Sequence, residues 1–545
     1  MKNIVSIIIL ILTSIILIEC ASEAQLTGGA KDTLPPVIVY SKPKNKSTHF
    51  DATKISIRMD EFIKLNNLQS ELVLSPPIKP KPEIVVRGKN LEISLNDAPL
   101  LPNTTYTIFL GKAIADIHEN NAIPNFKYTF STGDFVDSLS LKGKVKDALE
   151  LTPEEEALVM LYRKGQNDTL ALDSLPLLSM PLYLSRTDKE GAFKIENIAQ
   201  GKYLIFALKD DNRNYRYDLP SEKIAFIDTL ISLNYPLNDS AKINIPYLEL
   251  FMFQEIDSTQ RLLSAKLIKE NYLAVAYKNP LIKPKVNLLT KNSYFKWNNN
   301  NDSLFVWFPP VKKDSISILI SDNKDIHDTL NIRVVARKNQ QNVKLNITSN
   351  VKKNSLSPHD QLNLFFNYPI KSLNTDKIKI LEDSIPVPFV AQFVDSNKMQ
   401  LLLDYEMKEE QKYRIVIPDS TLIDIRNHNN DSTEIVCSRN STDKYGTLTV
   451  KLNTKDTIRK IIQLLDSKGV SIRNTIVKDS LVSFELLAPA EYQLKCIYDA
   501  NRNGVWDAGN YIQHIQAEEV KLYDKKIKVR ASWELQETWQ LEKIK

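Results

Sequence analysis

Glycine is scarce in this chain, with 13 glycines among 545 residues, about a third of the usual ~7% share. This scarcity argues against glycine-rich phosphate-binding loops and flexible glycine-serine linkers. No Gly-x-Ser-x-Gly or Cys-x-x-Cys motif occurs, and the 6 histidines lack metal-ligand spacing. We therefore expect a non-catalytic protein. The alternative is an unrecognised hydrolase whose carboxylates meet only in three dimensions.

The chain also lacks a large excess of positive or negative charge, because its formal net charge is only +5. No basic cluster is interleaved with aromatic residues, so nucleic acid is not an expected partner. The hydrophobic fraction of 43% and charged fraction of 25% are those of ordinary globular proteins. A chain of this length is too long for one core, and the usual domain size gives roughly three to five domains.

Cysteine is nearly absent as well, and the three positions differ in context. Cys437 and Cys496 lie in alternating apolar segments, where a small buried thiol fits a strand. Cys20 follows Lys2 and an almost unbroken apolar run over residues 4–18. Because spanning a bilayer takes ~20 apolar residues, this run is too short and predicts a secretory signal peptide over residues 1–20.

The end of the signal, residues 17–20, resembles a bacterial lipoprotein box. The resemblance implies cleavage before Cys20 and a diacylglycerol anchor on its thiol, and therefore a membrane contact through lipid. Glu19 departs from the small residue that such a box has, so an ordinary signal with an incidental cysteine is the alternative. We expect the chain in the cell envelope, anchored at the outer membrane, on either its periplasmic or its surface side.

Hydrophobic and polar residues alternate with period two through most of the chain. Short alternating runs such as residues 54–59 and 126–130 are separated by Pro, Asn and Asp, and no convincing amphipathic helix occurs among them. This pattern is typical of antiparallel sandwiches and predicts an all-β fold.

The first alternating region carries a family resemblance. Residues 32–36, 60–63, 101–108 and 130–133 resemble the SbsA-type bacterial Ig-like domain, in a combination similar to the start of Bacteroidota-type envelope lipoproteins. The resemblance implies a β-sandwich on the outer envelope that serves as a structural and binding unit without a known catalytic centre.

One motif occurs twice, 289 positions apart, and indicates that one module is used twice. Tyr203 and Tyr492 are each followed, seven residues later, by Asp-x-Asn-x-Asn-x-x-x-Asp. Residues 187–203, which lead into the first copy, resemble carboxypeptidase regulatory-like and collagen-adhesin B-type modules, which implies transthyretin-like sandwiches. The motif residues are Asp210, Asn212, Asn214 and Asp218 in the first copy, and Asp499, Asn501, Asn503 and Asp507 in the second.

These loops are the candidate metal sites, because oxygens at positions one, three, five and nine have the spacing of an EF-hand-like calcium loop. The second copy has Gly504 at position six but Asn510 at position twelve, where an EF-hand has glutamate. The first copy has Tyr215 and Ser221 there, with Glu222 one place late. Incomplete ligand sets predict weak Ca²⁺ binding, ~10⁻⁴–10⁻³ M. Asx-turns without metal are the alternative.

A weaker echo of the first domain, residues 362–366 against 55–59, indicates a second Ig-like domain. The chain is therefore predicted to run as follows: signal peptide 1–20, tether 21–35, Ig-like domain 36–133, transthyretin-like module 134–235, β-sandwich of uncertain type 236–340, second Ig-like domain 341–440 and second transthyretin-like module 441–545. The predicted function is a structural spacer or binding scaffold for an unidentified envelope protein or glycan. A glycan-binding or glycan-processing accessory protein and an assembly factor for outer-membrane machinery are the alternatives.

Overall fold

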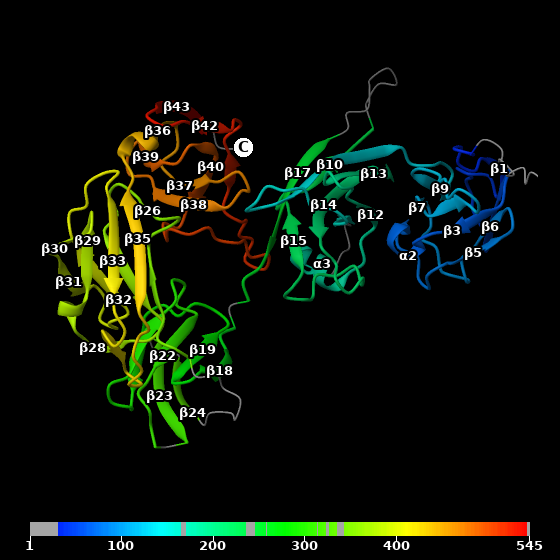
Figure 1. The fold of residues 1–545 in the computed structure, drawn as a ribbon. Coiled ribbons are helices and arrows are strands. Elements are labelled where there is room, and N and C mark those ends of the chain that lie inside the picture. The colour runs from blue at the N-terminus through cyan, green and yellow to red at the C-terminus, as the bar shows by residue number, and fades with distance from the viewer. Residues whose placement is uncertain are drawn as a thin grey trace, which may run out of the picture. The chain divides into compact units, whose positions relative to one another are not determined.

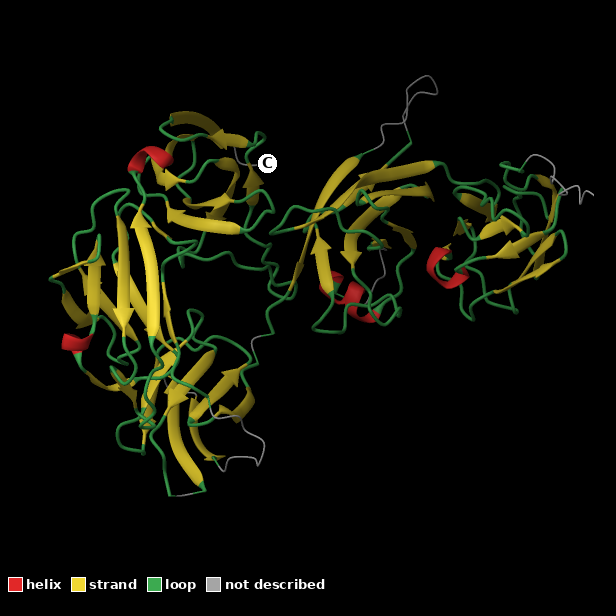
Figure 2. Cartoon of the chain, viewed as in Figure 1, coloured by secondary structure: helices red, strands yellow, loops and turns green. Residues whose placement is uncertain are grey.

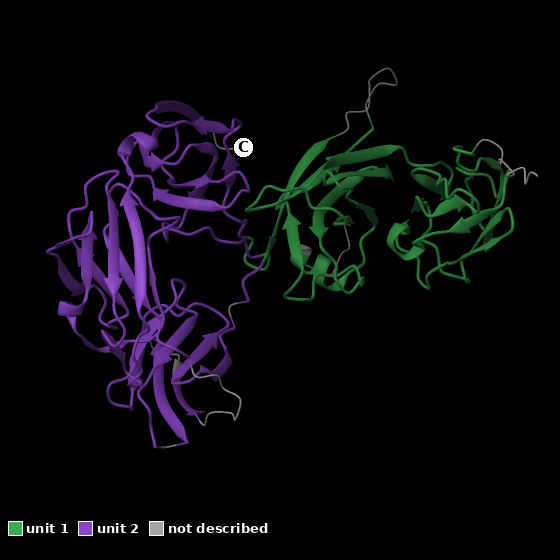
Figure 3. Ribbon diagram, viewed as in Figure 1, with its two compact units in different colours: residues 1–254, 511–514 green, residues 255–510, 515–545 purple. Residues whose placement is uncertain are grey.

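The computed structural model describes residues 31–164, 171–235, 246–257, 259–312, 314–322, 326–334 and 343–541. Strands dominate this part of the chain, which confirms the all-β fold class (Figures 1 and 2). The chain divides into two compact units, residues 1–254 with 511–514 and residues 255–510 with 515–545 (Figure 3). The predicted signal peptide and Cys20 lie outside the described residues. Within these residues, no helix has the length and apolarity needed to cross a membrane.

The first Ig-like domain pairs its strands in the orders β1-β2-β6-β5, β4-β7-β9 and β3-β8. Alternation places Ile55, Ile57 and Met59 of one strand in the core while their neighbours face outward, as period two requires. The elements are β1 (Ile38–Lys42), β2 (Lys54–Met59), β3 (Ile63–Leu65), α2 (Leu68–Glu71), β4 (Val73–Ser75), β5 (Glu83–Arg87), β6 (Asn90–Ser94), β7 (Thr105–Gly111), β8 (Ile114–Asp116) and β9 (Phe126–Ser131).

The first repeat module follows, with strand order β12-β11-β14-β15-β17-β10-β13 and β16 on β14. The sheet continues past residue 235, the predicted end of the module, because β17 pairs in parallel with β10. The alternation of apolar and polar residues within a strand does not show which distant strand it pairs with. The elements are β10 (Leu139–Asp147), β11 (Leu158–Arg163), η1 (Leu172–Ser174), α3 (Leu175–Leu178), β12 (Tyr183–Arg186), β13 (Ala192–Ile198), β14 (Gly201–Leu208), β15 (Lys223–Phe226), β16 (Ile231–Leu233) and β17 (Tyr247–Gln254).

The second unit begins with a middle domain of two sheets, β18-β19-β22-β21 and β20-β23-β24. The inward-facing residues of these strands form one hydrophobic core, as in a sandwich. The strands are β18 (Leu262–Lys269), β19 (Tyr272–Tyr277), β20 (Pro284–Leu288), β21 (Tyr294–Trp297), β22 (Ser303–Trp307), β23 (Ser315–Asp322) and β24 (Ile326–Arg333).

The second Ig-like domain repeats the strand order of the first, with β25-β27-β32-β31 in one sheet, β35-β33-β29 within the other, and β28-β34 as the short pair. The elements are β25 (Ile347–Ser349), β26 (Ser355–Leu356), β27 (Leu362–Phe366), β28 (Ile370–Leu373), η2 (Thr375–Lys377), β29 (Lys379–Glu382), β30 (Ile385–Val387), β31 (Val390–Phe393), β32 (Gln400–Asp404), β33 (Lys412–Ile417), β34 (Leu422–Asp424) and β35 (Thr433–Arg439).

The second repeat module pairs β36 with β39 and, in parallel, with β43, just as β10 pairs with β13 and β17. The repeated tyrosines have one role: the hydroxyls of Tyr203 and Tyr492 each donate to the carbonyl four residues earlier, at 2.7 Å. Exact domain boundaries stay predictions. The elements are η3 (Thr442–Lys444), β36 (Gly446–Thr454), β37 (Arg459–Leu465), β38 (Ser471–Ile476), β39 (Leu481–Leu487), β40 (Ala490–Asp499), β41 (Val520–Leu522), β42 (Ile527–Val529) and β43 (Glu534–Leu541).

Candidate functional site

The first Asp/Asn loop connects β14 to β15 and closes on itself through hydrogen bonds. Asp210 Oδ1 accepts the backbone N–H of Asn214 at 3.1 Å, and Oδ2 accepts that of Tyr215 at 2.9 Å. The side-chain amides of Asn212 and Asn214 donate to the two oxygens of Asp218, at 2.9 and 2.6 Å. The structure therefore brings all four predicted residues together.

The second loop, which leaves β40, repeats this network. Asp499 accepts the backbone N–H groups of Asn503 and Gly504, both at 3.0 Å. The amides of Asn501 and Asn503 donate to Asp507 Oδ2 at 2.7 and 2.6 Å. The two copies thus share their local geometry as well as their sequence pattern.

A glutamate that the motif does not include closes each loop, fully buried in the first copy and partly buried in the second. Glu222, which is 0% exposed, accepts backbone N–H groups of Asp211, Asp218 and Leu219 at 3.0–3.2 Å. Glu518 accepts those of Ala500 and Asp507 at 2.7 and 3.2 Å. This role does not follow from EF-hand spacing, which points forward to position twelve. Counting back from the next strand finds it, since Glu222 directly precedes β15 and Glu518 comes two residues before β41.

Both closing glutamates hold a proton more tightly than usual. Burial raises the pKa of Glu222, and the carboxylate of Asp210 adds to this, although the backbone donors act against them. Burial likewise raises the pKa of Glu518, with Asp507 and Asp499 adding to it. Each loop end is therefore a place where protonation and folding are coupled.

The loops' hydrogen bonds have the pattern of Asx-turns, in which Asp and Asn side chains accept from the backbone two to five residues ahead. Carboxylates and Asn oxygens are also ligands that Ca²⁺ accepts. A cation between Asn214 and Asp218 would replace the amide N–H groups that now point at the carboxylate. In the described ranges, no three or more His, Cys, Asp or Glu side chains are grouped so that they could hold a metal. Calcium binding stays a prediction.

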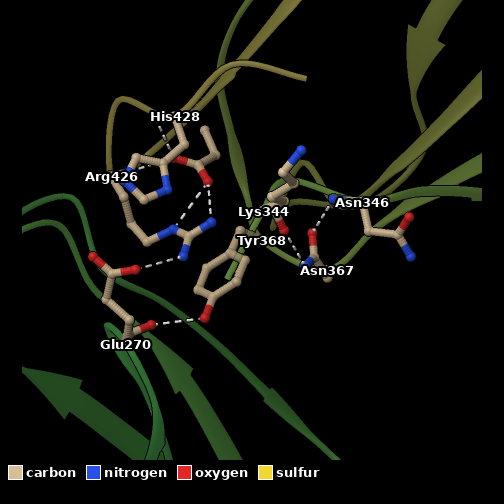
Figure 4. Close-up of polar contacts among 8 residues, drawn as sticks. Glu270, Lys344, Asn346, Asn367, Tyr368, Arg426 and His428 are labelled. Atoms are coloured by element: carbon tan, nitrogen blue, oxygen red, sulfur yellow. Dashed lines mark hydrogen bonds and ion pairs between the residues drawn. The ribbon is translucent and has the colours of Figure 1, made fainter. Parts of the chain in front are cut away.

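A second polar cluster lies at a corner of the second Ig-like domain, where β34 ends (Figure 4). Asp424 Oδ1 accepts the backbone N–H groups of Arg426 and His428 at 2.8 and 3.0 Å. Arg426 Nε and Nη2 donate to Asp424 Oδ2 at 2.9 and 2.6 Å, and both side chains are 0% exposed. Such a buried pair is stable only while both partners are present.

This corner fastens the β18–β19 turn of the middle domain. Arg426 Nη1 donates to Glu270 Oε2 at 3.1 Å, and the guanidinium lies 3.5 Å from the centre of the Tyr368 ring (Figure 4). The Tyr368 hydroxyl donates to the Glu270 carbonyl at 2.7 Å. Burial raises the pKa of Tyr368 to about 12, which keeps this hydroxyl protonated as a donor.

Apolar side chains cover the same corner. Tyr368 and Ile425 form a small buried cluster with Trp307 of β22, on which Tyr272 stacks with ring centres 5.1 Å apart. We call Asp424, Arg426, Tyr368 and Ile425 the Asp424 corner. No sequence signal reveals this joint, because Glu270 and Arg426 are 156 residues apart and share no motif.

A groove of about 850 Å³ lies between the first Ig-like domain and the first repeat module. Arg186 crosses it and donates to the Ser70 carbonyl at 2.6 Å, and Lys127 pairs with Glu196. A sugar site would present exposed aromatic rings beside a carboxylate pair, whereas charged and short polar side chains predominate in this lining. The groove therefore gives no specific support to glycan binding.

Comparisons with known proteins identify one domain. Residues 32–132 match the family described as bacterial Ig-like domain, which confirms the prediction of such a domain at this end of the chain. No curated protein matches the chain. Among solved structures, BcpA, the major pilin subunit of Bacillus cereus, is 9% identical over 74% of this chain and 99% of its own, with a TM-score of 0.14.

Two further solved structures resemble the chain at the same distant level. The Bacillus anthracis TIE protein is 10% identical over 95% of this chain and 76% of its own, with a TM-score of 0.13. The S-layer protein rSbsC(31-844) is 10% identical over 91% and 67%, with a TM-score of 0.14. At such scores we carry no property of these proteins over to this chain.

Proposed function

We propose that this chain is a non-catalytic structural protein of the bacterial cell envelope, anchored by lipid on Cys20, and that it works as a spacer or binding scaffold. The observation that carries the proposal is the Asp424 corner. There a buried ion pair, a cation–π contact and an apolar cluster fasten one β-sandwich to the next. A joint of this kind keeps two neighbouring domains in a fixed relative orientation. A scaffold requires this, whereas a catalytic cleft that opens by a hinge does not.

Two further observations support the envelope as the location. The apolar leader ending at Cys20 predicts export and lipidation, and residues 32–132 match the bacterial Ig-like domain. These observations sit at the same end of the chain. An Ig-like domain placed next to an anchor is well positioned to hold the later domains away from the membrane.

The anchor is tested by replacing its cysteine. In cells fed a palmitate analogue, we expect the wild-type chain to carry the label and to fractionate with membranes, and Cys20→Ala to lose both. Cys437→Ala is the matched control, because that thiol is buried and unable to reach lipid. An unlabelled wild-type chain, or a Cys20→Ala variant that keeps its label, would overturn the anchored scaffold.

A further inference from the structure

The first Ig-like domain has the same corner as the second. Ile63 pairs with Asp116 as Ile370 pairs with Asp424. One hydrogen bond also recurs: the residue after each aspartate donates its backbone N–H to the residue before each isoleucine. These pairs are Ile117 to Phe62 at 3.3 Å and Ile425 to Pro369 at 3.1 Å.

The two corners differ in what covers them. Ile425 is 6% exposed because Trp307 of the middle domain lies over it, whereas Ile117 is 45% exposed. Phe62, which stands where the second domain has buried Pro369, is 54% exposed. The first corner therefore presents two large apolar side chains at the place where the second corner forms a domain joint.

The charge of the two corners is also different. By register, Glu61 occupies the position of Tyr368, and His118 that of Arg426. Burial raises the pKa of Glu61, and four nearby carboxylates raise it further: Asp116, Asp60, Asp32 and Glu119.

Two cations also face the first corner. Lys89 Nζ lies 5.4 Å from the centre of the Phe62 ring and donates to the Asp60 carbonyl, and Lys64 Nζ donates to the Ile117 carbonyl at 3.3 Å. The carboxylates outnumber them, so the first corner is acidic, whereas in the second corner Arg426 and Asp424 offset each other's charge.

We propose that the surface formed by Glu61, Phe62 and Ile117, the Phe62 corner, is a docking site for another envelope protein. The partner inserts a β-turn that carries an aromatic side chain, as Tyr272 does in the second corner, and a lysine or arginine in the place of Glu270. Charge complementarity selects this partner over a second copy of the chain, whose own turn would bring Glu270 against Glu61. The inference rests on the proposed envelope scaffold and assigns it a contact surface.

The test is site-specific photo-cross-linking in intact cells with the full chain. A benzophenone amino acid replaces Phe62, and the same probe at Phe135, which is 64% exposed and lies outside the corner, is the control. We expect one additional cross-linked protein at Phe62, joined through a segment that has Lys or Arg beside an aromatic residue. Adding Glu61→Lys or Ile117→Asp should reduce this product at least tenfold. Changing the partner's basic residue to an acidic one should restore the cross-linked product in the Glu61→Lys chain.

Several results would overturn the docking site: equal products at both positions, a cross-link to a second copy or to residues 1–30, or a product insensitive to both corner variants. Thermal unfolding of the variants shows whether the fold survives. If a corner variant does not fold, the charge reversal on the partner, tested with the unchanged corner, provides a second measure. Fractionation of the same cells separates the two proposals. An envelope-located chain without the Phe62 product overturns only the docking site, whereas loss of envelope location overturns the scaffold.

Discussion

The corners at Asp116 and Asp424 share one backbone and differ in a few side chains. Both aspartates are buried at the end of a short strand and accept backbone N–H groups from the residues that follow. In the second corner Arg426 and Tyr368 donate to Glu270 of a neighbouring domain. In the first, the described part of the chain shows no such bond from His118 or Glu61. The Ig-like backbone is thus common to both corners, and the side chains at two positions distinguish the corner that contacts a neighbouring domain.

The two Asp/Asn loops give a second comparison of the same kind. Asp499 is balanced by Arg459, whose Nε and Nη2 lie 2.8 and 2.6 Å from its Oδ2. At position six the second loop has Gly504 at φ +87°, and the first has Tyr215 at φ +65°. Similar hydrogen-bond networks therefore form around a different backbone conformation and a different charge, and mutations can measure what each difference contributes to stability.

The largest expected effect comes from breaking the Asp424 corner. Arg426→Met leaves the buried Asp424 carboxylate without its cation, and breaking such a pair costs about 3–5 kcal/mol. The matched change in the first corner is His118→Met, where the side chain is exposed and little change in stability is expected. Calorimetry of the full chain should show one transition moved by the first variant and none by the second.

A double variant is the control for this interpretation. Arg426→Met combined with Asp424→Asn removes both charges, and the asparagine oxygen can still accept the two backbone N–H groups that Asp424 Oδ1 accepts. The double variant should therefore recover part of the lost stability, because no unpaired buried charge remains. If the single Arg426 variant melts like the wild type, the buried pair does not stabilise the joint and the contrast between the corners fails.

The next effect comes from the closing glutamates. Glutamine accepts hydrogen bonds on only one oxygen, so Glu222→Gln and Glu518→Gln each leave at least one backbone N–H group of the loop without its acceptor, which costs up to about 1–3 kcal/mol where water cannot replace it. The first loop should lose more, since Glu222 is 0% exposed, whereas Glu518 is only partly buried and the Ala500 N–H that it accepts is open to water. Calorimetric melting of both variants checks this order, and equal losses would contradict it.

The pH dependence of the same variants checks the raised pKa values. A glutamate whose pKa is raised by folding binds its proton more tightly in the folded state, so its contribution is full below the ordinary value and falls as pH rises through the folded value. The stability advantage of the wild type over Glu222→Gln should therefore shrink from about pH 4.5 upward. An advantage that grows over this range would show that the pKa is lowered.

Calcium addition gives a smaller effect. With a dissociation constant of ~10⁻³ M, 10 mM Ca²⁺ would stabilise a loaded module by about 1.4 kcal/mol. We expect the shift to be larger for the second module, whose loop has glycine at position six as an EF-hand does. Melting in CaCl₂ is compared with melting in EDTA and in MgCl₂ at equal ionic strength. Identical melting in all three would leave the loops as Asx-turns alone.

These comparisons also show what sequence can and cannot predict in such a chain. Alternation predicted the strands, because a half-buried strand repeats every two residues wherever it lies. The motif that follows both Tyr203 and Tyr492 predicted that one module occurs twice, because the tyrosine and the loop after it are close together in the sequence. Contacts between distant segments leave no such local trace. The Asp424 corner and the partners of Glu518 depend on where strand ends meet, which a single sequence does not encode as a period.

The smallest effect tests the backbone difference between the loops. An L-residue at φ +87° is strained, so Gly504→Ala should cost about 1 kcal/mol. A methyl group there would meet Ile476 Cδ1 at 3.5 Å, an ordinary contact, so the cost comes from the backbone alone. Gly504→Asn should cost less, because asparagine tolerates positive φ. If alanine and asparagine cost the same, crowding rather than backbone conformation separates this loop from the one that carries Tyr215.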